Sequence, residues 1–102
     1  MKNKKLIRLN FRDAVFSRDG HACKFCGKIE NLDAHHITDR SLMPNGGYVL
    51  ENGITVCEIC HLMCEKYHMS DGKSWSEGKH PTDLYNMIGS SFETAVAKSS
   101  NR

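Results

Sequence analysis

Residues 51–61, ENGITVCEICH, carry the pattern that predicts the centre of the fold. The β-branched run GITVC at 53–57 predicts a short strand, and the pattern becomes helical from Glu58 onward. Two cysteines in Cys-x-x-Cys spacing, Cys57 and Cys60, lie across this junction. The stretch therefore predicts a strand that runs directly into a helix, with a pair of thiols where the two elements meet.

A second Cys-x-x-Cys pair lies in CKFCG, at residues 23–27, thirty residues before the first. Four thiolates at about 2.3 Å from one Zn²⁺ form a closed, tetrahedral structural site. Neither pair follows the βαβ pattern of a thioredoxin-like redox centre. We therefore predict a structural zinc site whose ligands are Cys23, Cys26, Cys57 and Cys60.

Cys64 is left over from this set. On a helix it lies four residues after Cys60 and four before His68, so these three residues offer an alternative ligand set. The other interpretation, which we favour, is a free thiol that packs on one face of the helix.

The composition agrees with one small, metal-supported domain. The chain has 102 residues, of which 39% are hydrophobic, so its core is thin and a structural metal would stabilise it. Arg8, Asn10 and Arg12 interrupt any signal-peptide apolar region, and no segment approaches the roughly 20 apolar residues of a membrane span. We expect no membrane association and a cytoplasmic location, where reducing conditions leave thiols available for metal.

The net charge of +2 identifies no partner by itself. Basic residues nevertheless precede the first acidic residue, Asp13. They are Lys2, Lys4, Lys5, Arg8 and Arg12. We interpret residues 1–10 as a basic arm that is either a solvated tail or a contact to nucleic-acid phosphates, with Lys4, Lys5, Arg8 and Arg12 as candidate contacts.

Further elements surround the central junction. Residues 32–37 are predicted to form a strand, and residues 38–52 contain too many Gly, Pro and Asn residues for regular structure. We expect one helix over 11–18 and another over 81–88. A last helix is expected after the capping-box spacing of Ser90 and Glu93.

The predicted organisation has three parts. They are a basic arm at 1–10, a folded unit at 11–98 that includes a C-terminal helical extension, and a frayed tail at 99–102. Residues from Tyr67 to the end carry no motif that indicates chemistry.

The runs HHITDR at 35–40 and ENGITVCEICH at 51–61 resemble the HNH endonucleases, in particular the group in which two Cys-x-x-Cys knuckles enclose the active site. The resemblance covers residues 12–65, with RDGHACKFCG at 18–27 as its lead-in. It implies an α+β fold, a small single domain with a ββα-metal (His-Me finger) core, a four-Cys structural zinc site and flanking helices. The implied activity is metal-dependent hydrolysis of DNA phosphodiester bonds that leaves 5′-phosphate and 3′-hydroxyl ends.

The resemblance also implies roles for single residues. His35 and His61 would be ligands of one catalytic cation, His36 the general base that activates water, and Asn52 the residue that holds the base in position. Glu65 is either a further ligand or a solvated side chain, and both interpretations stay open. The residue types suit the chemistry, because a histidine with a pKa near about 6.5 can accept a proton at neutral pH. Neighbouring strand residues point to opposite faces, so His35 and His36 should have different tasks.

The catalytic ion is not defined by two imidazoles, which accept Mg²⁺, Mn²⁺, Ni²⁺ or Zn²⁺. The resemblance favours Mg²⁺ or Mn²⁺, and double-stranded DNA as the partner, with RNA as a weaker alternative. A small domain with one active site must form a homodimer or act twice to cut both strands. Compact members of the family occur in phages, mobile elements and restriction systems.

A noncatalytic zinc-binding module that binds nucleic acid is the alternative function. In that interpretation the histidines are structural. The combination of His35-His36, Asn52 and His61 inside the zinc frame favours the nuclease, because a binding module has no use for this set.

Overall fold

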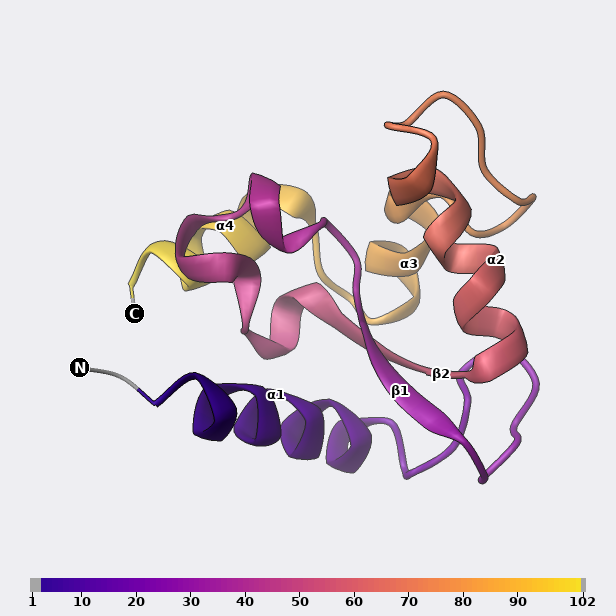
Figure 1. The fold of residues 1–102 in the computed structure, drawn as a ribbon, viewed down its shortest axis with the longest axis horizontal. Helices are drawn as coiled ribbons and strands as arrows, with labels where there is room; N and C mark the ends of the chain where they lie inside the picture. The colour runs from indigo at the N-terminus through magenta and orange to yellow at the C-terminus, as the bar shows by residue number, and fades with distance from the viewer. Residues whose placement is uncertain (1–2, 102) are drawn as a thin grey trace.

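The computed structural model describes residues 3–101. In chain order the elements are α1 (Lys4–Arg18), β1 (Leu32–His36), three short 3₁₀ helices η1 (Arg40–Leu42), η2 (Pro44–Gly47) and η3 (Leu50–Asn52), β2 (Gly53–Cys57), α2 (Glu58–Met69), α3 (Pro81–Met87) and α4 (Phe92–Ser100). The two strands form an antiparallel sheet, and α2 follows β2 without a linker. The predicted small α+β fold is therefore confirmed, with ββα order at its centre (Figure 1).

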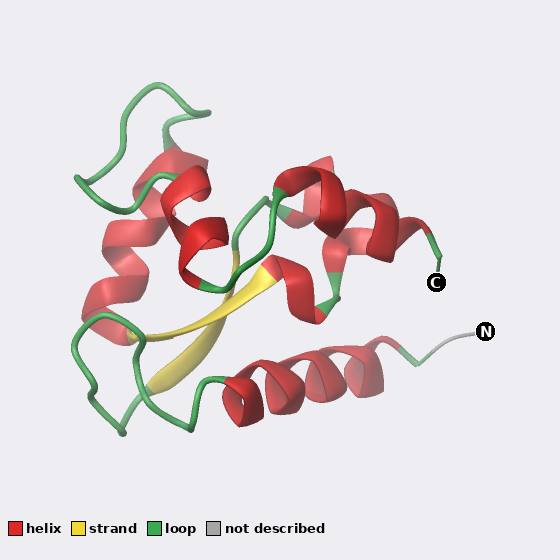
Figure 2. Cartoon of the chain, turned by 180° about the vertical axis from the view of Figure 1, so that it is seen from behind, coloured by secondary structure: helices red, strands yellow, loops and turns green. Residues whose placement is uncertain are grey.

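The helices lie on both sides of the strand pair. Helix α1 runs along one side, and α2 and α3 lie on the other (Figure 1). The loop between α1 and β1 curves back beside the start of α2, as the view from behind also shows (Figure 2). This arrangement brings the CKFCG segment next to the junction of β2 and α2.

Helix α1 packs directly on the backbone of β2. Gly53 allows this approach, because a Cβ atom at that position would lie 2.5 Å from Val15 and 2.7 Å from Phe11. Gly53 is the register partner of His36 on β1. The absence of a side chain at Gly53 thus lets Phe11 of α1 reach the neighbourhood of His36.

The core is small and lies between the sheet, α2 and the C-terminal helices. Its fully buried members include Ile37, Ile54, Val56, Leu84 and Ala95. Thr55 and Asn52 are also fully buried, so polar groups share this interior. Among residues 3–101, none of the helices combines the length and the apolar character needed to cross a bilayer.

The helix expected over 11–18 begins earlier, because Lys4 to Asn10, which belong to the expected basic arm at 1–10, form the first half of α1. Asn3 caps this helix, and its side chain accepts a hydrogen bond of 3.2 Å from Leu6 N. The sequence KKLIRL consists of good helix formers, and an exposed Asn10 is tolerated inside a helix, so the helix starts earlier than predicted. Lys2 lies outside the described residues.

The frayed tail expected at 99–102 is also wrong over its first residues. Helix α4 continues to Ser100, and Ser99 is fully buried. The Ser99 carbonyl accepts a hydrogen bond of 2.9 Å from Asn45 Nδ2, which attaches the end of α4 to η2. The N-cap of α4 is Ser91 rather than Ser90.

Candidate metal centres and hydrolytic site

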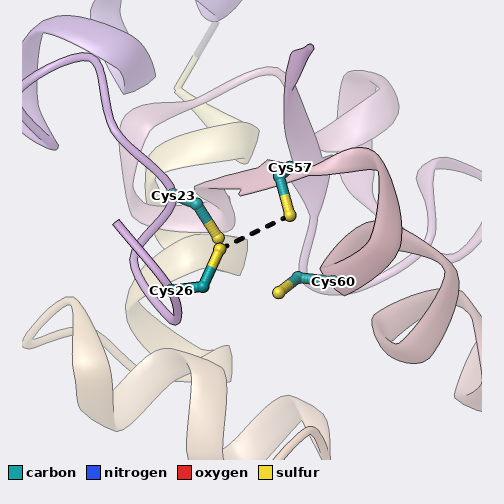
Figure 3. A group of neighbouring side chains, drawn as sticks. All are labelled: Cys23, Cys26, Cys57 and Cys60. Atoms are coloured by element: carbon teal, nitrogen blue, oxygen red, sulfur yellow. Dashed lines mark hydrogen bonds between the residues drawn. The ribbon is translucent and has the colours of Figure 1, made fainter. Parts of the chain in front are cut away.

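The four predicted zinc ligands form one cluster. Their sulfur atoms all lie within 4.8 Å of one another, and the side chains converge from the loop after α1, the end of β2 and the first turn of α2 (Figure 3). The Cys26 and Cys57 sulfurs are 3.6 Å apart. Tetrahedral ligation with Zn–S bonds of about 2.3 Å places sulfurs about 3.8 Å apart, so four thiolates at this spacing suit Zn²⁺. Cys23, Cys26, Cys57 and Cys60 therefore fit a structural zinc site.

Backbone hydrogen bonds hold the first knuckle in place. Cys23 N donates to Lys28 O at 2.8 Å, and Lys24 N donates to Thr55 O at 3.0 Å, which fastens the knuckle to β2. Burial raises the pKa of the Cys23 thiol, but hydrogen bonds from the backbone of Cys26 and Cys57 outweigh burial and lower it. A lowered pKa favours the thiolate, which is the form that binds metal.

Cys64 lies outside this four-thiol cluster, as we favoured from the sequence. Its side chain is buried in the core, and burial raises the pKa of the thiol to about 12. A neutral thiol in apolar surroundings is a packing residue rather than a ligand.

A second cluster lies on the α2 side of the sheet and consists of His35, His61 and Glu65. Their ligand atoms also lie within 4.8 Å of one another. Glu65 Oε1 is 3.0 Å from His61 Nε2 and 3.4 Å from His35 Nδ1. The half-buried Glu65 thus faces both imidazoles, which favours its interpretation as a ligand over that of a solvated side chain.

His35 provides the test of whether these residues suit a cation. Its side chain is 1% exposed, and neither ring nitrogen has a hydrogen-bond partner among residues 3–101. The 3.4 Å approach of Glu65 to Nδ1 lacks hydrogen-bond geometry. Leaving a buried polar nitrogen without a partner is costly, and a bound cation would remove that cost at one nitrogen. Two imidazoles and one carboxylate suit a divalent ion.

Asp33 joins the cluster through His61, whose Nδ1 is 3.3 Å from Asp33 Oδ2. Hydrogen bonding to Asp33 and Glu65 raises the pKa of His61 to about 9. The neighbouring imidazoles of His35 and His61 hold the pKa of Glu65 well below its usual range. The sequence analysis missed Asp33, although its position two residues before His35 placed both side chains on one face of β1.

His36 lies on the α1 side of the sheet. Its ring stacks on Phe11 with centroids 4.5 Å apart and meets Tyr48 edge-on at 4.8 Å. Burial, followed by the positive charge of Arg40, lowers the pKa of His36 to about 4. The ring is therefore neutral at pH 7 and able to accept a proton. It lines a cleft of about 510 Å³ together with His61 and Glu65.

Asn52 is fully buried, and all of its side-chain hydrogen bonds go to the segments around the site. Its Oδ1 accepts from Thr38 N at 2.9 Å, and its Nδ2 donates to Thr38 O at 3.1 Å and to Gly47 O at 3.2 Å. In addition, Ile37 N donates to Asn52 O at 2.9 Å. The amide of Asn52 thus fastens the chain immediately after His36.

Two further residues contact the site, and the sequence analysis gave neither of them a role there. His68 Nε2 donates to His36 O at 2.9 Å, and its ring stacks on that of His35. Tyr85 of α3 donates to Asn52 Oδ1 at 2.8 Å. His68 lies two helical turns after His61 on the same face of α2, but nothing in the sequence connects Tyr85 to the site. His80 caps α3 by accepting from Thr82 N at 3.1 Å.

The predicted nucleic-acid contacts all lie on α1 and are exposed. Arg8 and Arg12 line the cleft that contains His36. Lys4 lines an adjoining cleft with Arg8. Lys5 lines neither of these clefts.

A ββα unit thus joins a four-thiol cluster that fits structural zinc to a cluster of two histidines and one glutamate that could hold a second cation. Residues 22–66 match the model of the family described as HNH endonuclease. Residues 22–66 therefore form the HNH endonuclease domain that the resemblance predicted, and this match supports a nuclease-family function. The comparison with curated proteins and the comparison with solved structures found no match.

Proposed function

We propose that the chain is a metal-dependent DNA endonuclease that hydrolyses phosphodiester bonds. The observation that carries the proposal is that a neutral His36 lines the same cleft as His61 and Glu65, which cluster with the buried His35. A buried His35 with two unpartnered nitrogens among the described residues supports a bound cation rather than a purely structural role.

The cluster would hold one divalent cation through His35, His61 and Glu65. We propose Mg²⁺ or Mn²⁺, with Ni²⁺ or Zn²⁺ as alternatives that the same donors accept. When bound, such a cation stabilises negative charge on the phosphate and on the leaving 3′ oxygen. The fully buried position of His35 and the carboxylate of Asp33 behind His61 keep the two imidazoles oriented toward each other.

His36 is the proposed general base. It takes a proton from the water that attacks phosphorus; the P–O3′ bond breaks, and the leaving 3′ oxygen takes up a proton from solvent, which gives a 5′-phosphate and a 3′-hydroxyl. Stacking on Phe11 fixes the plane of the ring, and the bonds from Asn52 to Thr38 and from His68 to His36 O fix the backbone on which it sits. His36 and the backbone that carries it are therefore held in position before substrate binds.

The thiol cluster supports this site through direct adjacency. Cys60 belongs to the zinc cluster, and the next residue, His61, belongs to the cation cluster. Both lie in the first turns of α2, so a helix anchored by zinc also places a cation ligand. All five cysteines are free of disulfides, which suits the reducing compartment that we propose.

We propose double-stranded DNA as the substrate. Cutting both strands would then need a homodimer or two successive events at one site. If the protein were only a noncatalytic zinc-binding module, it would bind nucleic acid with His36 dispensable and no dependence on a second cation.

Incubation of the zinc-loaded protein with supercoiled plasmid tests the proposal. Nicked or linear product should form with added Mg²⁺ or Mn²⁺ and be lost when no second cation is supplied. The His36→Ala protein should be inactive, whereas His21→Asn, a change at an exposed histidine outside the cleft, should leave cleavage intact. Plasmid that remains supercoiled with every cation, in the presence of measurable DNA binding, would favour the noncatalytic module.

A further inference from the structure

We call the cleft that contains His36 the hydrolytic cleft. A second cleft adjoins it along α1. It has a volume of about 560 Å³. Four residues line both clefts, namely Arg8, Asp39, Arg40 and Tyr48. The two clefts are therefore direct neighbours that share these side chains, and the second one reaches Lys4 at the beginning of α1.

The lining of this second cleft is basic. Lys4, Arg8 and Arg40 line it, against a single acidic residue, Asp39. No carboxylate among residues 3–101 forms an ion pair with Arg8 or Arg40. The Asp39 carboxylate instead accepts hydrogen bonds from the backbone N and the hydroxyl of Ser41. The cations therefore remain available for an anionic ligand.

Tyr48 connects these cations to the proposed base. Its hydroxyl accepts a hydrogen bond of 3.0 Å from Arg40 Nη1, and its ring contacts His36 edge-on. Burial raises the pKa of the Tyr48 phenol, but hydrogen bonding to Arg40 and Arg8 outweighs burial and lowers it. The guanidinium groups of Arg40 and Arg8 thus both lie near the Tyr48 phenol. The Tyr48 ring in turn contacts His36, the proposed general base.

We propose that this second cleft is the path of one DNA strand beside the scissile bond, with Arg40 and Arg8 bound to the flanking phosphate and Lys4 to the next. The inference rests on the proposed function and names the substrate contacts of that site. A guanidinium matches two phosphate oxygens at once, and paired arginines beside an aromatic ring suit a phosphodiester backbone better than a neutral ligand. Because the two clefts share Arg8, Asp39, Arg40 and Tyr48, the proposed occupant is a strand of the same duplex that enters the hydrolytic cleft.

Arg40 was not among the contacts predicted from the sequence, where it ends the run HHITDR; in the structure it is the first residue of η1. Its role depends on how the segment after β1 folds over α1. The structure brings Arg40 and Arg8 to one cleft from positions 32 residues apart in the chain.

Fluorescence anisotropy with a labelled DNA duplex, without added divalent cation, tests this path over a series of salt concentrations. Arg40→Gln and Arg8→Gln should each weaken binding roughly tenfold at low salt, as the loss of a charge-assisted hydrogen bond does. Each should also reduce the slope of log K against log salt by about 0.9 for one lost phosphate contact. Tyr48→Phe keeps every charge, so it should weaken binding less and leave the slope unchanged.

Lys73→Gln is the matched control, because Lys73 is exposed, carries the same charge and lines neither cleft. If Arg40→Gln and Arg8→Gln behave like Lys73→Gln in affinity and slope, the proposed path is wrong, whether or not plasmid is cleaved. If both arginine variants bind weakly but the wild-type protein cleaves no plasmid with any cation, the path stands and the proposed hydrolysis fails. Melting temperatures of the zinc-loaded variants confirm that each is folded.

Discussion

The hydroxyl of Tyr85 donates a hydrogen bond of 2.8 Å to Oδ1 of Asn52, so the C-terminal extension reaches the centre of the HNH domain. The same hydroxyl lies within hydrogen-bond distance, 2.6 Å, of Thr38 Oγ1. Both Tyr85 and Asn52 are buried. Helix α3 therefore supports the amide that fastens the chain behind His36.

Tyr85→Phe should lower the free energy of unfolding by about 1 to 2 kcal/mol, because the buried Asn52 and Thr38 each lose a partner. Plasmid cleavage should slow while cation affinity is unchanged, since no ligand is touched. Tyr67→Phe is the control, because its hydroxyl makes no hydrogen bond among the described residues. If Tyr85→Phe and Tyr67→Phe had equal effects on cleavage, Tyr85 would not support the site.

Replacement of Cys57 by Ser should release zinc and unfold the domain. The binding free energy of a structural zinc, on the order of 10 kcal/mol, is folding free energy in so small a core. Cys64→Ala should retain stoichiometric zinc, because Cys64 lies outside the cluster. Metal analysis and circular dichroism measure both outcomes, and zinc loss from Cys64→Ala equal to that from Cys57→Ser would contradict the assigned ligand set.

His36→Ala and His35→Ala should separate base from ligand. His36→Ala removes the proton acceptor, so cleavage should fall by about 10²- to 10⁴-fold while Mn²⁺ affinity is retained. His35→Ala and His61→Ala should instead weaken Mn²⁺ binding, and excess cation should restore part of the activity. Calorimetric titration of the zinc-loaded proteins with Mn²⁺ measures the difference. If Mn²⁺ binding were lost in His36→Ala alone, the roles of base and ligand assigned to His36 and His35 would have to be exchanged.

Asp33→Asn should weaken Mn²⁺ binding by about 10- to 100-fold, the usual effect of removing a carboxylate that orients a ligating histidine. Asp33 approaches His61 Nδ1, so its loss frees the ring to rotate. Glu30→Gln, an exposed change just before β1, is the matched control and should bind Mn²⁺ normally. Identical Mn²⁺ affinity in the two variants would show that Asp33 does not position His61.

The contact between Asp33 and His61 also predicts a pH dependence of stability in zinc-loaded protein without a second cation. The pKa of His61 is raised from 6.5 to about 9, first by Asp33 and then by Glu65. A raised pKa means that protonated His61 stabilises the fold fully below pH 6.5, and that this stabilisation is lost as the pH rises through about 9. Denaturant unfolding across this range should show the decline in the wild type and a smaller decline in Asp33→Asn. NMR titration should show that the pKa of His61 is lower in Asp33→Asn than in the wild type.

Local features of the sequence were sufficient for the zinc knuckles and the ββα order. The spacing within each Cys-x-x-Cys pair, the run GITVC and the helical pattern after Glu58 act over a few residues, so they can be recognised without the fold. The alternation of strand side chains likewise separated His35 from His36. The boundaries of α1 and α4 were wrong because the exposed Asn10 and the buried Ser99 are tolerated inside helices that tertiary contacts stabilise.

Only the tertiary structure decided which distant residues complete the site. The sequence left two interpretations of Glu65 open. In the structure β1 and α2 pack together, and this packing places His35 next to Glu65. Tyr85 and Asn52 are 33 residues apart, and no local spacing encodes their hydrogen bond. Such contacts depend on how separate elements pack, because a hydrogen bond needs two groups within about 3 Å and the chain between them can be of any length.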